Sequence, residues 1–147
     1  MKNIFIGFVL GVIMITVIYL MSNSETPERV PVRLEQPYFF LHDIPNDSLV
    51  TCALNYYGVK YPEIVLRQAK LETGNYKSIN CKKNHNLFGL YNSRTKQYFK
   101  FKHWTESVEF YKNNIQRRYQ RGDYYQFLEN IGYAEDSLYI QKLKYLK

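Results

Sequence analysis

The sequence is poor in the residues that build metal and redox sites. Among 147 residues, the only cysteines are Cys52 and Cys81, and they form no C-x-x-C pair. The histidines His42, His85 and His103 are scattered, so Cys81 and His85 offer one pair of ligands where structural zinc needs four. We therefore expect no metal site and no cofactor. The two cysteines leave two interpretations open, a single disulfide in an oxidising compartment or two buried thiols.

Acidic residues are also scarce relative to basic ones. The chain has 13 Asp and Glu against 20 Lys and Arg, a net charge of +7. Such an excess suggests an anionic partner, which could be nucleic acid, anionic lipid or an acidic polymer. The 15 tyrosines add flat faces suited to stacking on bases or sugar rings. With 46% apolar residues, the chain is not expected to be disordered throughout.

One long apolar run lies near the N-terminus, at residues 4–21, and it contains no charged residue. At 1.5 Å per residue a helix of this length spans about 27 Å, enough for a bilayer core. Lys2 precedes the run, which favours an N-terminus in the cytoplasm and a domain outside. We predict a membrane anchor over residues 1–24. A cleaved signal peptide is the alternative, although Ser22 and Ser24 make a poor cleavage site.

The rest of the chain divides into a tether and one domain. Residues 25–45 hold four of the five prolines and little periodicity, so we expect an extended tether. The domain is predicted over residues 46–147. Capping residues predict helices that start near Asn46 or Asp47, at Pro62, at Thr105, at Asp123, and at Asp136 or Ser137.

A hairpin is predicted between the second and third helices. In LFGLYNSRTKQYFKF, residues 87–101, apolar and aromatic ends flank a polar middle. This pattern indicates residues 87–91 paired with residues 98–101. The predicted fold class is α+β, mainly α, with one short β-hairpin.

Glu72 is the most distinctive acidic residue. It shares a helix face with Val65, Gln68 and Ala69, just before Gly74 ends the helix. Burial on that face would raise its pKa, and the negative end of the helix dipole acts in the same direction. A protonated carboxyl near neutral pH is what a general acid needs to break a glycosidic bond. The alternative from these residues alone is a solvated charge at a helix end.

Four motifs in order resemble a known family. They are QAKLETGNYKS (68–78), NLFGL (86–90), SVEFY (107–111) and GYAEDSLYIQKL (132–143). Together they resemble the glucosaminidase-like domain, glycoside hydrolase family 73 of the lysozyme-like superfamily, of the flagellar muramidase and autolysin type. The resemblance covers about residues 47–147.

The resemblance implies a lysozyme-like fold and a peptidoglycan hydrolase that cleaves the glycan backbone at N-acetylglucosamine. By position, Glu72 matches the general acid, and Tyr133 matches a tyrosine that positions substrate or stabilises charge. Tyr139 matches an aromatic of the final helix, which we interpret as core. The segment that forms the floor of the cleft is matched by Asn86, Leu87, Phe88 and Gly89.

The sequence departs from the family where a second carboxylate is usually assigned. Residues 91–101 contain no Asp or Glu. Glu106 is the nearest acid downstream, but it falls in the first turn of a helix, where a carboxylate stabilises the helix end without any catalytic role. Without a second carboxylate, the acetamido group of the substrate could act as the nucleophile.

Further residues of the hairpin suggest substrate contacts. Tyr91 and Tyr98 could stack on sugars, as could Trp104, although such aromatics more often belong to a core. Basic residues could line the rim of the cleft and meet stem-peptide carboxylates, although solvated faces are the ordinary interpretation. These basic residues are Arg94, Lys96, Lys100, Lys102, Arg117, Arg118 and Arg121.

Three alternatives accompany the hydrolase. One is a peptidoglycan-binding module of the same fold with weak catalysis, and another is a lytic transglycosylase, which would use the same acid. The third is a nucleic-acid-binding protein, which the apolar N-terminal run argues against. Together with the predicted anchor at residues 4–21, the resemblance implies a single-pass protein of the bacterial inner membrane with its domain facing the periplasm or cell wall. If the signal is cleaved, the protein is secreted.

Overall fold

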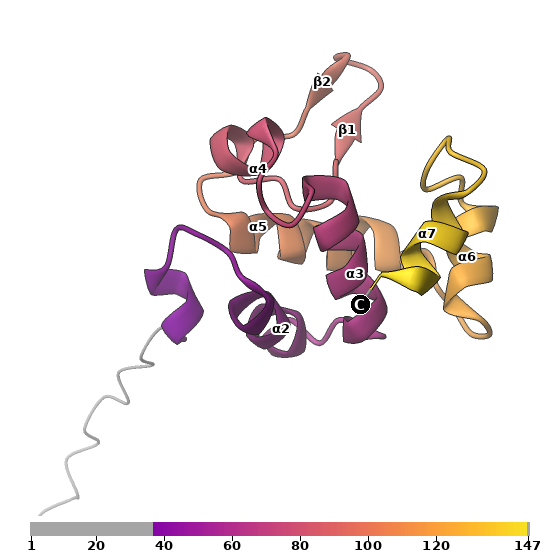
Figure 1. Ribbon diagram of the computed structural model, residues 1–147, viewed down its shortest axis with the longest axis horizontal. Coiled ribbons are helices and arrows are strands. Elements are labelled where there is room, and N and C mark those ends of the chain that lie inside the picture. Colours follow the sequence, from indigo (N-terminus) through magenta and orange to yellow (C-terminus); the bar gives the residue numbers. More distant parts are fainter. Residues whose placement is uncertain (1–36, 147) are drawn as a thin grey trace, which may run out of the picture. The chain divides into compact units, whose positions relative to one another are not determined.

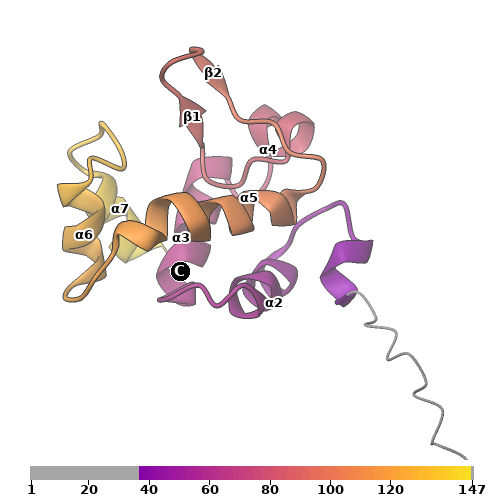
Figure 2. The ribbon, with the colours of Figure 1, turned by 180° about the vertical axis from the view of Figure 1, so that it is seen from behind.

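The computed structural model describes residues 37–146, which form helices and one small hairpin (Figure 1). This arrangement confirms a mainly helical α+β domain. In both Figure 1 and Figure 2, α3 lies near the middle, with α5 crossing it and the hairpin at one end. The elements are η1 (Tyr38–Leu41), α2 (Asp47–Tyr56), α3 (Pro62–Thr73), α4 (Ile79–Asn84), β1 (Tyr91–Asn92), β2 (Gln97–Tyr98), α5 (Trp104–Phe110), η2 (Tyr111–Ile115), η3 (Gln116–Arg118), α6 (Tyr124–Asn130) and α7 (Tyr139–Tyr145).

Capping residues set most of the helix ends as predicted. The Asn46 side chain accepts a hydrogen bond from the Leu49 amide at the start of α2. Pro62 begins α3, and Gly74 ends it in the left-handed conformation at φ 56°. Asp123 caps α6 by accepting a bond from the Gln126 amide. These side chains satisfy backbone groups that a helix end leaves unpaired.

Several elements differ from the prediction, among them α7, which begins at Tyr139 after Leu138 and not at Asp136 or Ser137. The loop before the hairpin contains α4, which Ser78 caps through the Cys81 amide. The hairpin pairs only Tyr91–Asn92 with Gln97–Tyr98, because residues 87–90 turn into the core instead of forming a strand. Helix α5 starts two residues early, because its cap is His103 and not Thr105, which is buried.

The packed domain begins before Asn46. Where an extended tether was predicted, η1 buries the ring of Phe39 in the core. The His42 carbonyl then accepts hydrogen bonds from the Trp104 indole N–H at 2.7 Å and from His103 Nε2 at 2.9 Å. The described end of this segment is therefore part of the fold.

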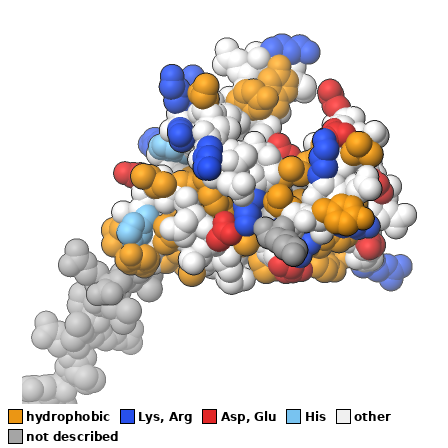
Figure 3. Space-filling model, viewed as in Figure 1, with side chains coloured by type: hydrophobic (Ala, Val, Ile, Leu, Met, Phe, Trp, Pro, Cys, Tyr) orange, Lys and Arg blue, Asp and Glu red, His pale blue; other side chains and the backbone are white. Residues whose placement is uncertain are grey.

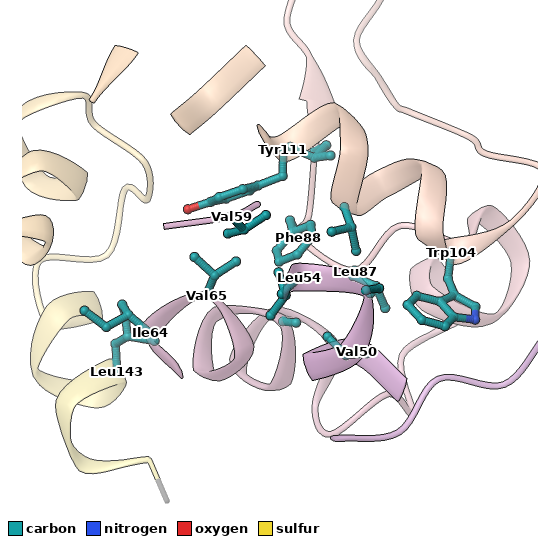
Figure 4. Close-up of a cluster of buried hydrophobic side chains, with 14 of the residues drawn as sticks. Val50, Leu54, Val59, Ile64, Val65, Leu87, Phe88, Trp104, Tyr111 and Leu143 are labelled. Atoms are coloured by element: carbon teal, nitrogen blue, oxygen red, sulfur yellow. The ribbon is translucent and has the colours of Figure 1, made fainter. Parts of the chain in front are cut away.

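The core surrounds α3. Figure 4 shows Val50, Leu54, Leu87 and Phe88 packed together, with Trp104 at one end of the cluster and Leu143 at the other. Each large apolar side chain buried in this way contributes about 1.5–3 kcal/mol. This packing fixes the end of α3 and the 86–90 loop relative to each other.

Two further predictions concern the membrane and the cysteines. Within residues 37–146, no helix is both long and apolar enough to cross a membrane. The predicted span at residues 4–21 lies outside this range. Cys52 and Cys81 are free thiols, the first exposed and the second buried, so the alternative of a disulfide is not realised.

Candidate active site

Glu72 lies in the last turn of α3, on the face that carries the fully buried Val65 and Ala69. Its side chain is half-buried. Burial raises the pKa of the Glu72 carboxyl, because the charged form loses hydration, while a hydrogen bond with the Tyr139 side chain lowers it in part. The net direction is upward, as the apolar stripe of the sequence predicts.

Gly89 provides the space into which the Glu72 carboxyl fits. A Cβ atom at this position would lie 2.7 Å from Glu72 Oε2, closer than atoms can approach without a shift. Gly89 also has φ of +59°, a conformation that side chains disfavour. Two independent reasons therefore favour glycine here, because an added methyl group would strain the backbone and would make the Glu72 carboxyl move.

Asn86 holds this segment in place. Its side chain is fully buried and donates to the carbonyls of Leu90 and Phe99, at 2.9 and 3.1 Å. Its Oδ1 accepts from the amides of Phe88 and Leu90. One side chain thus closes the loop beneath Gly89 and ties it to the chain that leaves the hairpin. Asn86 and the buried Leu87 support the site from within the fold.

Tyr133 stands beside the same loop. Its hydroxyl donates to the Phe88 carbonyl at 2.9 Å, and its ring packs near Tyr111 and Tyr139. Burial, with the charges of nearby groups including Glu72, raises the pKa of Tyr133 well above its usual value. It therefore stays a neutral hydrogen-bond donor near the carboxyl.

Tyr139 was expected in the core, but its contact with Glu72 was not predicted from the sequence. Its ring is buried, as a core residue should be, but its hydroxyl also forms a hydrogen bond with the Glu72 carboxyl. Gln68 Nε2 donates to the same hydroxyl oxygen at 3.3 Å, so the tyrosine proton is directed to Glu72. The signal in the sequence was Gln68, an amide within an otherwise apolar stripe that needs a buried partner.

A chain of buried hydrogen bonds continues behind Gln68. Gln116 is anchored by the backbone of Lys60, accepting from its amide and donating to its carbonyl, both at 2.7 Å. The same Gln116 amide group donates to the Tyr124 hydroxyl, which lies 2.8 Å from the Tyr111 hydroxyl. Tyr111 in turn donates to Gln68 Oε1 at 2.7 Å.

The backbone anchor determines the direction of every bond in this chain. Because Gln116 must present N–H to Tyr124, the Tyr124 proton points to Tyr111. The Tyr111 proton then points to Gln68, which leaves the Gln68 amide N–H for Tyr139. Hydrogen bonds aligned in series polarise and strengthen one another. The helical side of the site therefore presents Glu72 with an oriented donor.

A cavity of about 250 Å³ opens beside these groups. Gly89 and Tyr133 line it, and Tyr91 lines it from the hairpin. Glu72 is not among the lining residues, but its carboxyl lies close to Gly89. None of its lining residues is acidic, and Arg118 is the one that carries a charge. Its lining consists of residues 88–91, Phe99, Phe110, Ile115, Arg118 and residues 131–133.

The hairpin contributes few side chains to the lining of the cavity. Tyr91 and Tyr98 pair across the two strands with their rings 5.2 Å apart, and about half of each side chain is exposed. Tyr91 lines the cavity, whereas Tyr98 does not. In Figure 3, lysine and arginine side chains lie at the hairpin tip and over α4.

Glu106 lies away from the cavity. Its Oε2 accepts a hydrogen bond from the Lys102 amide at 3.0 Å, just before α5. That is the role of an acidic residue at a helix start. Trp104 is fully buried and donates to His42, so it is held in the core.

Comparison with known proteins gives the same family as the motifs. The family model named Glucosaminidase, described as mannosyl-glycoprotein endo-beta-N-acetylglucosaminidase, matches residues 48–146. Neither a curated protein nor a solved structure matches the chain at a significant level.

Proposed function

Because the chain belongs to the glucosaminidase family, we propose that it is a peptidoglycan hydrolase of the endo-β-N-acetylglucosaminidase type, with Glu72 as its general acid. The observation that carries the proposal is the setting of Glu72, a half-buried carboxyl with a raised pKa that contacts Gly89 beside an open cavity. A carboxyl in this setting is suited to protonating a leaving oxygen.

In the proposed reaction, the Glu72 proton moves to the glycosidic oxygen while the bond from that oxygen to C1 breaks. After this transfer Glu72 is a carboxylate, and Tyr139 stabilises it through its hydrogen bond. The same bond holds the carboxyl close to Gly89, a residue that lines the cavity. Proton donation by a positioned side chain contributes about 10²–10⁴ to the rate.

The second group in the proposed reaction belongs to the substrate. No acidic side chain lines the cavity, so the acetamido oxygen of N-acetylglucosamine attacks C1 as the leaving group departs. Water then opens the resulting ring, and the Glu72 carboxylate takes up a proton from that water. This substrate-assisted route gives retention of configuration at C1. Tyr133, whose hydroxyl is held by Phe88, shapes the site beside the reacting sugar.

We further propose that the protein is fixed to the outer face of a bacterial cytoplasmic membrane through residues 4–21. The remaining residues before the domain would then act as a tether that lets it reach the glycan layer. Fractionation of cells that express the full chain tests this placement. Recovery in the membrane fraction, with the domain sensitive to external protease, is the expected result, and release into the medium would indicate a cleaved signal.

The products of peptidoglycan digestion test the reaction. Incubation of the full chain with purified peptidoglycan should release new reducing N-acetylglucosamine ends, and nuclear magnetic resonance of fresh product should show retained configuration. Anhydro sugar ends would indicate a lytic transglycosylase instead. Binding to the glycan without new ends would indicate a binding module.

A further inference from the structure

Arg118 occupies a position shared by two cavities. It lines the cavity beside Gly89 and Tyr133, and it also lines a neighbouring cavity of about 250 Å³ formed by residues 118–123 and α6. Arg117, the next residue in the chain, lines neither of them. A group bound by Arg118 would therefore lie within reach of a glycan strand in the first cavity.

The backbone that carries Arg118 is anchored on both sides. Gln116 is buried and bonded to Lys60 and Tyr124. Tyr119 is buried too, and its hydroxyl donates to the Gly122 carbonyl at 2.7 Å. The Arg118 side chain thus extends from a fixed point, so a ligand does not have to order the backbone beneath it.

The guanidinium of Arg118 has no acidic partner among residues 37–146. The ion pairs in this part of the chain join Lys70 to Asp47 and Lys142 to Asp136. Asp123 lines the second cavity, but its carboxylate accepts the Gln126 amide as the cap of α6. An exposed, unpaired guanidinium beside a cavity with aromatic lining residues and no acidic ones is suited to an anionic group on an otherwise neutral ligand.

We propose that Arg118 binds a stem-peptide carboxylate of peptidoglycan, so that the site selects glycan that still carries its peptides. This inference rests on the proposed function and narrows its substrate. In peptide-bearing glycan the lactyl carboxyl of N-acetylmuramic acid is joined to the peptide as an amide. The free carboxylates are then those of the peptides, and they match the planar fork of an arginine. Wall-polymer phosphates share this anionic chemistry, and the experiment separates them from the peptides.

The test uses binding, so that it does not depend on turnover. The full chain carrying Glu72→Gln is titrated with two soluble glycans free of phosphate polymers. One is peptide-bearing peptidoglycan, and the other is an oligomer of N-acetylglucosamine, which has neither peptides nor lactyl carboxylates. The proposal predicts tighter binding to the peptide-bearing form. Adding Arg118→Ala should weaken that binding about tenfold, equivalent to about 1.4 kcal/mol, and leave the peptide-free glycan unaffected. Arg117→Ala, the matched control, should change neither.

Four results would overturn the proposal. They are an equal loss on both glycans, an equal loss with Arg117→Ala, absence of binding to peptide-bearing glycan, and an Arg118-dependent preference for a purified phosphate wall polymer over that glycan. Arg118-dependent binding by a chain whose unmutated form releases no sugar ends would instead support the peptide site and reject the proposed hydrolysis.

Discussion

The two sides of the candidate site are built very differently. On the helical side, Glu72 receives a hydrogen bond from Tyr139, and an oriented chain of buried amides and hydroxyls extends behind it to Lys60. On the hairpin side, two paired residues per strand support two half-exposed tyrosines, and no carboxylate faces the cavity.

This contrast indicates which side of the candidate site holds its side chains in fixed positions. A side chain that must hold a proton in one orientation needs a rigid, satisfied polar surrounding, and the helical side provides it. The hairpin needs only to cover one face of a sugar. Changes on the helical side should therefore damage activity or folding strongly, and matched changes elsewhere should be mild.

Among changes to the surroundings of Glu72, the largest expected effect comes from Gly89→Ala compared with Gly58→Ala. Both glycines have positive φ, +59° and +63°, so each substitution should cost about 1–2 kcal/mol of stability from backbone strain. Only at Gly89 would the new methyl displace the Glu72 carboxyl, since nothing lies within 4 Å of a Cβ at Gly58. Initial rates on peptidoglycan should fall about 100-fold in Gly89→Ala alone. Equal rates in the two variants would refute a role for this contact.

Asn86→Ala compared with Asn92→Ala tests the same contrast through stability. Both side chains accept two backbone amides, but Asn86 is buried beneath the site and Asn92 lies in the exposed hairpin turn. Without the Asn86 side chain, buried backbone amides and carbonyls lose their hydrogen-bond partner. The free energy of unfolding should therefore fall by about 3 kcal/mol. Loss of Asn92 should lower it by less than about 1 kcal/mol. Urea denaturation measures both, and similar values would contradict the difference between the two regions.

Tyr139→Phe should reduce activity about tenfold and shift its pH dependence, with Tyr145→Phe on the exposed face of α7 as the control. The Tyr139 hydroxyl lowers the pKa of Glu72 by stabilising its charged form. Its removal should raise that pKa further, so the alkaline limb of the rate profile moves to higher pH. A lower rate with an unmoved limb would mean that Tyr139 acts only by packing.

The smallest effect concerns the stability of Glu72→Gln. Because burial raises the pKa of Glu72 above its ordinary 4.5, the folded chain keeps this proton when the unfolded chain has released it. The contribution of this proton to the free energy of unfolding is fully present below pH 4.5, and it is lost as the pH rises through the raised pKa of the folded chain. Glu72→Gln cannot ionise, so its melting temperature should exceed that of the unmutated chain increasingly from pH 4.5 to 7. A constant difference over this range would contradict a buried, protonated Glu72.

Local signals in the sequence were sufficient for most of the fold and for the burial of Glu72. Asn46, Pro62, Gly74 and Asp123 mark helix ends because their chemistry acts within a few residues. The stripe that leads to Glu72 likewise predicted its burial. These features depend on near neighbours in the chain, which is why they could be predicted.

Features that depend on distant contacts could not be predicted. Residues 87–90 have the composition of a strand, but burial around Asn86 turns them into a loop. Tyr139 meets Glu72 only because α7 packs near α3, across 67 residues of sequence. The hydrogen bond from the Lys102 amide to Glu106 is a local contact by comparison, and it matches the helix-end role that the sequence already indicated.

The central claim is that one protein carboxyl, Glu72, performs the chemistry. The most direct measurement is the rate of release of reducing sugar ends from peptidoglycan by the full chain, by Glu72→Gln and by Glu106→Gln. A rate at least about 100-fold lower in Glu72→Gln, with Glu106→Gln within about twofold of the unmutated chain, is the predicted result. Undiminished release by Glu72→Gln, or an equally large loss in Glu106→Gln, would contradict the account.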